Sequence, residues 1–202
     1  MATCPLVQAP LYSTLPEPPL GQHRFVAARN GVMLEARNRA LHFTTGLYPA
    51  MPAVPAGDAV EHVTLAAGPI PRALLDKAFR RSRETAPKEW AGLIVMNGSG
   101  DGYELIEPVV ESAGAGYVRW QTDAIPDDRL VLDIHSHGDG PPYHSPTDDE
   151  SDRRGGVFLS VVIGRSRADT PQFVFRYVAH GVFAQPAAAT DLLHPEIVAP
   201  HP

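Results

Sequence analysis

Cysteine is almost absent from the 202 residues, and Cys4 near the N-terminus is the only one. A single cysteine cannot form a disulfide within the chain, and it cannot build a cysteine-rich structural zinc site. The first residues lack the basic segment and apolar core of a secretory signal. No apolar run approaches the roughly 20 residues that a membrane helix requires. We therefore expect a cytoplasmic protein in a reducing compartment.

Positive charge is also scarce, because 17 Lys and Arg residues stand against 23 Asp and Glu residues, giving a formal net charge of -6. The densest basic cluster, Arg80, Arg81 and Arg83, ends a predicted helix, where cations suit the helix dipole. The hydrophobic fraction of 44% is ordinary for a folded protein. We expect neither nucleic acid nor a membrane among the partners.

The first 62 residues predict a proline-rich arm followed by a small β-meander. Five prolines fall within residues 1–21. Asn30-Gly31 separates two apolar runs and is the strongest short signal for a β-hairpin. A second reversal near residues 37–39 leads into another apolar run. Residues 48–57 are rich in proline and alanine, which is typical of a linker.

Residues 63–185 show a different pattern, which predicts an α/β fold with a mixed β-sheet flanked by helices. A helix is expected after Pro71, where a missing N–H costs nothing, and a second one is expected between Ser145 and Arg154. Apolar runs predict buried strands at 89–96, 103–110, 130–137, 158–163 and 173–178. Residues 186–202 are rich in alanine, proline and histidine and predict a flexible tail.

One short segment carries candidate metal ligands. His135 and His137 stand two apart on a predicted strand, so both side chains point to the same side. The Gly/Pro-rich loop that follows must turn, and the short helix after it can bring Asp148 back toward the histidines. Two histidines and one carboxylate leave one tetrahedral position open, which is the pattern of a catalytic zinc site with water in the fourth place. Such a site holds one zinc ion and lowers the pKa of its water to about 7.

A hydrolase also needs a proton carrier and a donor for the oxyanion. Glu89 is the candidate general acid/base, since a carboxylate at the entry of an apolar strand is costly unless it has a task. Ser145 is the candidate oxyanion donor. The segment from Ser145 to Asp148 fits a helix N-terminus equally well, with Ser145 as the cap. Both interpretations can hold for one side chain.

These residues resemble the JAMM (JAB1/MPN/Mov34, MPN-plus) metallopeptidases, whose pattern is Glu, His-x-His, seven residues, then Ser-x-x-Asp. His135-Ser136-His137, residues 138–144 and Ser145 to Asp148 match it without a gap, and Glu89-Trp90-Ala91-Gly92-Leu93 matches the typical Glu-x-x-Gly-Leu. The four-residue pattern should arise by chance on the order of once in a thousand such chains. The resemblance covers Val63 to Val178.

The JAMM resemblance implies a cytidine-deaminase-like sheet. It also implies zinc ligands at His135, His137 and Asp148, a general acid/base at Glu89, and an oxyanion donor at Ser145. Residues 23–31 add a narrower resemblance to the JAMM protein of the bacterial PRTRC gene system. There a ubiquitin-like protein and a ThiF/E1-like protein accompany it. The implied substrate is therefore the tail of a ubiquitin-like or sulfur-carrier protein.

Other polar residues near the motif have two interpretations. Asp133 shares the face of the histidines and is either a partner that holds one of them or a strand-edge residue. His144 favours a solvated loop position. Asp149, Glu150 and Asp152 favour a solvated acidic turn of the second helix. A second zinc ion is not expected, because there is no spare cysteine and the 138–144 loop is short.

Two rival functions remain open from the sequence. The chain could be an MPN-type interaction scaffold without catalysis, against which the complete ligand set argues. It could also be a zinc amidohydrolase that acts on a small amide. Zinc content separates the first rival from a peptidase, and the choice of substrate separates the second.

Overall fold

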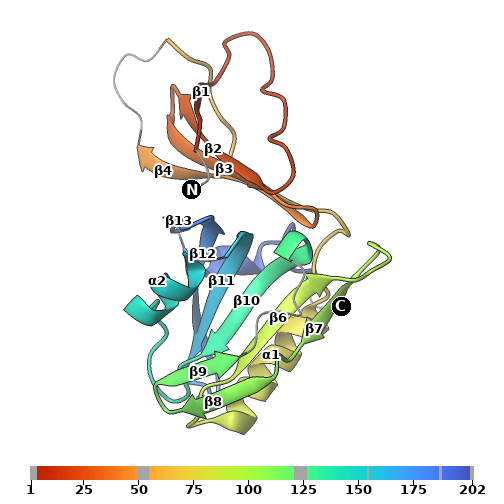
Figure 1. Cartoon of the computed structure of the whole chain (residues 1–202), viewed down its shortest axis with the longest axis vertical. Coiled ribbons are helices and arrows are strands. Elements are labelled where there is room, and N and C mark those ends of the chain that lie inside the picture. Colours follow the sequence, from red (N-terminus) through yellow and green to blue (C-terminus); the bar gives the residue numbers. More distant parts are fainter. Residues whose placement is uncertain (1–3, 50–54, 121–126, 154, 187, 201–202) are drawn as a thin grey trace.

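The protein, described by a computed structural model, consists of a five-stranded sheet stacked on one end of an α/β unit (Figure 1). The structure describes residues 4–49, 55–120, 127–153, 155–186 and 188–200. Parts of the predicted arm (1–3), linker (50–54) and tail (187 and 201–202) lie outside these residues. No helix in the described ranges has the length and apolar character needed to cross a bilayer.

The N-terminal sheet contains the predicted meander. Its strands, in spatial as well as chain order, are β1 (Leu6–Gln8), β2 (Gln22–Ala28), β3 (Gly31–Arg37), β4 (Leu41–Pro49) and β5 (His62–Leu65). The β2–β3 hairpin turns through Arg29 and Asn30, and Gly31 begins β3 opposite Ala28. The hairpin is therefore confirmed, but its turn lies one residue earlier than Asn-Gly suggests. The expected boundary after residue 62 falls within β5.

The α/β unit is built on a six-stranded mixed sheet, which confirms the expected fold class. Its spatial order is β13-β12-β11-β10-β6-β7. The central pair β10–β11 is parallel, and the other described pairs of this sheet are antiparallel. Among the described residues, the sheet is accompanied by a hairpin, α-helices and short 3-10 helices. The bounds are α1 (Arg72–Thr85), β6 (Ala91–Met96), β7 (Tyr103–Ile106), β8 (Val110–Gly114), β9 (Tyr117–Trp120), η1 (Asp127–Arg129), β10 (Leu130–Ser136), α2 (Pro146–Asp152), β11 (Val157–Gly164), β12 (Gln172–Ala179), β13 (Val182–Ala184) and η2 (Ala189–Leu193).

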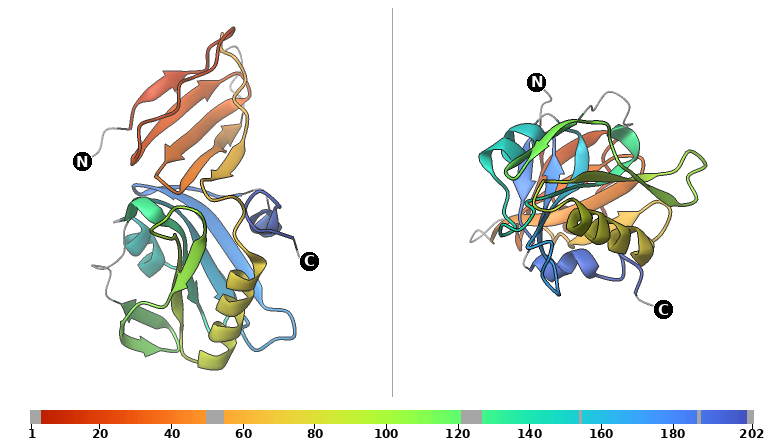
Figure 2. Two further views of the ribbon diagram at one scale, coloured as in Figure 1. Left: turned by 90° about the vertical axis from the view of Figure 1, so that its right-hand side faces the viewer. Right: turned by 90° about the horizontal axis from the view of Figure 1, so that it is seen from below.

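The two faces of the six-stranded sheet differ in chemistry. Successive side chains of a strand point to opposite faces, so Leu132 and Ile134 of β10 join the main core with α1. Asp133 and His135 point to the other face. Figure 2 shows α1 and α2 on opposite sides of the sheet. The sheet thus buries one apolar face and presents a partly polar face to α2.

The two sheets share one hydrophobic core. Phe43 of β4 and Tyr177 of β12 have ring centroids 4.9 Å apart. The turn between β3 and β4 is fixed by Asn38, whose buried amide nitrogen donates to the carbonyl oxygens of Leu130 at 2.8 Å and Val157 at 2.7 Å. The N-terminal sheet is therefore tied to the α/β unit by apolar packing and by hydrogen bonds.

The C-terminal segment differs from the flexible tail that its composition predicts. Leu192, Ile197 and Val198 are buried. The backbone N–H of Ile70 donates to the carbonyl of Ile197 at 2.8 Å, which forms a bridge beside the start of α1. A few apolar residues among alanine and proline are enough to anchor the described part of residues 186–202.

Candidate metal centre

The two histidines stand at the end of the central strand β10. His135 lies within the strand, and His137 follows it with its backbone N–H donating to the carbonyl of Ile163 at 2.8 Å. Their ring centroids are 5.2 Å apart. The side chains of His135 and His137 are 8% and 10% exposed. The predicted strand therefore places both imidazoles on one side, nearly shielded from water.

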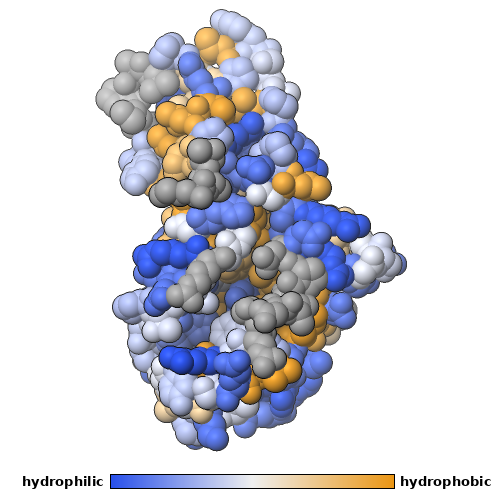
Figure 3. All heavy atoms as spheres, in the orientation of Figure 1, coloured by the Kyte–Doolittle hydropathy of each residue, from blue (hydrophilic) through white to orange (hydrophobic). Residues whose placement is uncertain are grey.

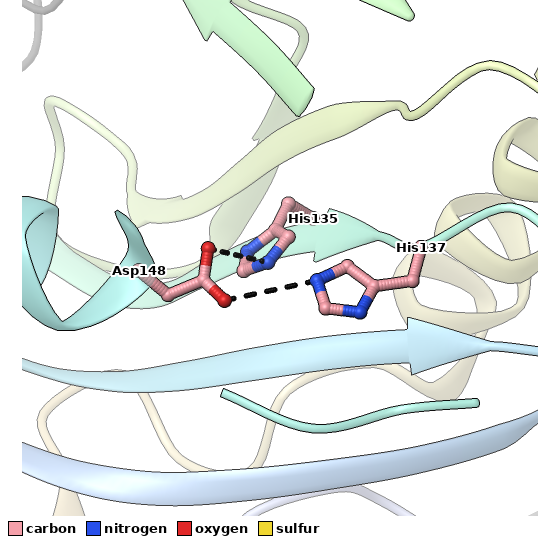
Figure 4. Close-up of side chains that lie close together, drawn as sticks. All are labelled: His135, His137 and Asp148. Carbon is pink, nitrogen blue, oxygen red and sulfur yellow. Dashed lines mark ion pairs between the residues drawn. The ribbon is translucent and has the colours of Figure 1, made fainter. Parts of the chain in front are cut away.

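Asp148 reaches the histidines because α2 begins at Pro146 and is capped by Ser145. The hydroxyl of Ser145 accepts from the backbone N–H of Asp148 at 3.2 Å, and the backbone N–H of Ser145 donates to Oδ2 of Asp148 at 2.6 Å. Pro146 occupies the first helical position, where it loses no hydrogen bond. This capping box turns the Asp148 carboxylate toward β10 (Figure 4).

The three side chains form a group that can hold a metal ion. Nε2 of His135 lies 3.1 Å from Oδ1 of Asp148, and Nε2 of His137 lies 3.7 Å from Oδ2. One ligand atom from each residue lies within 4.8 Å of the other two. Ligands around one tetrahedral zinc ion stand about 3.3 Å apart, given metal–ligand distances of about 2.0–2.2 Å. The donor set therefore fits zinc.

The buried Nε2 atom of His135 also supports a fit of this group to a zinc ion. Nε2 of His135 is buried and has no hydrogen-bond partner of good geometry among the described residues, although Asp148 lies close. A buried nitrogen without a partner is costly. The nitrogen and the carboxylate are thus near one another without being aligned for a proton. This is the arrangement expected of two groups that face a common ion.

The electrostatics of the group keep the carboxylate charged. Burial acts to raise the pKa of Asp148, but its contacts with His135 and His137 hold that pKa well below the usual range. Burial acts to lower the pKa of His135, yet Asp148 raises it overall. The ionised carboxylate is the form that binds a metal.

Glu89 lies beside this group because of the register between two antiparallel strands. Ala91 of β6 pairs with His135 of β10, so the residue two positions before Ala91 comes opposite His137. Glu89 is 7% exposed, and its backbone N–H donates to the carbonyl of Gly114 at 2.8 Å. Burial raises the pKa of Glu89, against the attraction of the two histidines. A carboxyl group that takes up a proton readily is what a general acid/base requires.

Residues 71–177, more than half of the chain, match the family described as prokaryotic homologs of the JAB domain. The chain belongs to this family. Residues 1–66 match a domain of unknown function, DUF2016. No curated protein matches the chain. The JAMM/MPN resemblance is confirmed at the level of the family, and the narrower link to the PRTRC system stays a prediction.

The glycine of the Glu-x-x-Gly-Leu motif has a steric reason in this JAB domain. The indole of Trp90 folds over Gly92, and a Cβ at Gly92 would lie 2.3 Å from the ring. Nε1 of Trp90 donates to Oε2 of Glu107 at 3.0 Å. Trp90 is 4% exposed and belongs to the core. The motif therefore packs the strand that presents Glu89.

The loop after His137 is fixed against the end of β11. The backbone N–H of Ser166 donates to the carbonyl of Gly138 at 2.8 Å, and that of Arg165 donates to Gly140 at 2.7 Å. Tyr143, which the sequence did not single out, sets its ring edge-on to His137 at 4.7 Å and is 53% exposed. An aromatic residue two positions before the serine of the motif is the signal that could have marked it.

His144 differs from the predicted solvated residue of this loop. Its Nε2 lies 3.4 Å from the carbonyl oxygen of Ser160, and it is only partly exposed. Burial, together with the charge of Arg176, lowers its pKa to about 4. His144 is therefore neutral near pH 7, and it packs between the loop and β11.

In the acidic turn of α2, Glu150 is exposed as expected, whereas Asp152 is buried. Asp152 is 4% exposed, and both Asp149 and Asp152 contact Arg176 of β12. Asp133 does share the face of His135, and its shielded Oδ1 has no hydrogen-bond partner among the described residues. Burial and the nearby Asp152 raise the pKa of Asp133 to about 7. A single arginine inside the apolar run 173–178 was the available signal for this cluster.

Proposed function

We propose that this JAB domain is a zinc-dependent metallopeptidase of the JAMM type that hydrolyses a peptide or isopeptide bond. The observation that carries the proposal is the convergence of His135, His137 and Asp148 within 4.8 Å, with the buried carboxyl of Glu89 facing them across the β6–β10 register. A scaffold has no need for a complete ligand set beside a buried acid. The site chemistry therefore favours hydrolysis.

Each residue then has a defined task. His135, His137 and Asp148 would hold one zinc ion, which when bound lowers the pKa of a water to about 7. Glu89 takes a proton from the attacking water and delivers it to the leaving amine, because burial favours its protonated form. The Ser145 hydroxyl accepts one bond from Asp148 and can still donate its own hydrogen to the oxyanion of the substrate.

A cavity beside Glu89 gives room for a segment of substrate chain, and its lining does not include His135, His137 or Asp148. This cavity of about 240 Å³ is bordered by Trp90 and by Val110 of the β8–β9 hairpin. We propose the tail of a ubiquitin-like or sulfur-carrier protein as the substrate, with a ThiF/E1-like protein in the same pathway. The support for these partners is the resemblance of residues 23–31 to the JAMM protein of the PRTRC system.

Two measurements test the proposal. Native mass spectrometry should find one zinc ion per chain, and a protein without stoichiometric zinc would favour the scaffold. Incubation with a ubiquitin-like fusion protein should then release the tail with the wild type and not with Glu89→Gln. Glu104→Gln is the matched control, because Glu104 is an exposed residue of β7. Cleavage of small amides with an intact fusion would favour the amidohydrolase instead.

A further inference from the structure

We infer that Arg176 is a positioning residue that holds α2, and with it Asp148, against the strand that carries the histidines. The inference deepens the proposed function, since it concerns the placement of a proposed zinc ligand. Arg176 lies on β12, two strands away from β10 in the sheet. It is separated from Asp148 by 27 intervening positions, and no part of the metal motif includes it.

The helix α2 has no apolar face with which to dock. Its seven residues read Pro-Thr-Asp-Asp-Glu-Ser-Asp, and the buried one among them is Asp152. Surface helices are normally held by a stripe of apolar residues. Isolated helices shorter than about 12 residues are also marginal in water. The position of α2 must therefore depend on polar contacts.

Arg176 supplies those contacts to both turns of the helix. Its Nη1 donates to Oδ1 of Asp149 at 2.5 Å, and its Nε and Nη2 donate to Oδ2 of Asp152 at 3.0 and 2.7 Å. The Arg176 side chain is 3% exposed, and its guanidinium lies 3.9 Å from the ring centroid of Phe183. Hydrogen bonds between charged groups are stronger than neutral ones, and shielding from water strengthens them further.

The contacts of Arg176 fix the distance between α2 and β10, which the helix cap does not determine. The bonds between Ser145 and Asp148 define the first turn of α2, but both residues belong to the same segment. They therefore do not set the distance of that segment from β10. Arg176 pairs with Ser160 of β11, and Ser160 pairs with Asp133 of β10. Arg176 is thus part of the same sheet as His135. By binding Asp149, it holds the residue next to Asp148 at a fixed position relative to that sheet.

The direction in which zinc affinity changes when Arg176 is removed distinguishes a positioning role from a purely electrostatic one. Arg176 is a cation near the proposed zinc site, so its removal should tighten zinc binding if only its charge mattered. If Arg176 positions Asp148, its removal should weaken zinc binding instead. Metal ligands must be held to within about 0.5 Å of their working geometry. Loss of a group that orients a ligand typically costs about 10- to 100-fold in metal affinity.

The test uses Arg176→Met and Arg176→Lys in the full chain. Lysine keeps the charge but cannot reach Asp149 and Asp152 together, so it should weaken zinc binding even if the methionine variant does not fold. Arg24→Met and Arg24→Lys are matched controls. Arg24 also forms a buried ion pair, 2.7 Å from Glu35, but in the N-terminal sheet. Zinc affinity is measured by competition with a chelator, and amide hydrogen exchange of residues 145–153 is measured on the metal-free protein.

We expect about 10- to 100-fold weaker zinc binding in the Arg176 variants and faster exchange of the α2 amides, with neither effect in the Arg24 variants. Unchanged zinc affinity together with unchanged α2 exchange would overturn the inference. Equal effects from the Arg24 variants would reduce Arg176 to general stability and would also overturn it. If the wild type binds no zinc while α2 loosens only in the Arg176 variants, the proposed function fails and the placement of α2 by Arg176 stands.

Discussion

Ser145 and Asp148 hold one another through two reciprocal hydrogen bonds. Oδ2 of Asp148 accepts from the backbone N–H of Ser145 at 2.6 Å, and Oγ of Ser145 accepts from the backbone N–H of Asp148 at 3.2 Å. This leaves Oδ1 of Asp148 facing His135 at 3.1 Å. The Asp148 carboxylate therefore caps α2 through Oδ2 and faces the candidate metal centre with both oxygens, because Oδ2 also lies 3.7 Å from Nε2 of His137. The same Asp148 side chain therefore belongs both to the helix cap and to the candidate ligand set.

This relationship predicts different results for two substitutions of Ser145. Ser145→Ala removes the cap and the hydroxyl, and should lower the free energy of unfolding by about 1 kcal/mol and the kcat by about 100-fold or more. Ser145→Gly keeps most of the capping stability but has no side chain that could donate a hydrogen to the oxyanion. It should restore stability in urea unfolding without restoring cleavage of the fusion protein. Recovery of both properties would assign Ser145 to capping alone.

Asn38 should be the most sensitive polar residue of the junction between the two sheets. Its side chain donates to the carbonyls of Leu130 and Val157, and it accepts from the backbone N–H groups of Ala40 and Leu41. Asn38→Ala leaves buried polar groups without partners, which should cost about 3 kcal/mol in urea unfolding.

Asn30→Ala is the control for Asn38→Ala. The Asn30 side chain also makes two hydrogen bonds, both with Ala59, but in an exposed position. It should cost less than about 1 kcal/mol, because water replaces the lost partner. Equal losses from the two variants would contradict the role of Asn38.

Ionised Glu35 should stabilise the protein at neutral pH, and this contribution should be lost in acid. Burial acts to raise its pKa, but hydrogen bonds with His42 and Arg24 lower it below the ordinary value of 4.5. A group with a lowered pKa contributes stability above its unfolded pKa, and that contribution is lost as the pH falls through the lower folded value. The wild type should therefore exceed Glu35→Gln in Tm at pH 7, and the difference should shrink below about pH 4.5.

The control for the acid effect is Glu104→Gln, an exposed residue of β7. Its Tm should follow that of the wild type across the same pH series. A difference between wild type and Glu35→Gln that stays constant from pH 7 to pH 3 would show that Glu35 does not act through its charge.

Gly138 should tolerate no side chain. Its φ is +54°, and an added Cβ would lie 2.5 Å from the carbonyl oxygen of Pro87. Left-handed backbone costs a non-glycine residue about 1–2 kcal/mol, and the clash adds to that. Gly138→Ala should therefore lower the urea midpoint clearly. Gly116→Ala, where a Cβ meets nothing within 4 Å, should leave it nearly unchanged.

Much of the fold was predictable because its signals are local. The apolar runs of β2, β3, β10 and β11 identified strands without any long-range information. The described β1 could not be found in this way. It is three residues long and pairs in parallel with β2 across a proline-rich segment. The packing of the C-terminal segment was not predicted, because amino-acid composition does not show which of its residues are buried in the core.

The sequence by itself determined the local geometry of the candidate metal centre. A spacing of two on a strand puts His135 and His137 on one side, and the segment from Ser145 to Asp148 writes its own helix cap. Only the tertiary structure decided which residues from distant segments lie beside the histidines and α2. The register of β6 against β10 brings Glu89 to the histidines, and β12 brings Arg176 to α2. Local geometry follows from neighbouring residues, whereas contacts between distant segments depend on strand order and register, which short sequence patterns do not specify.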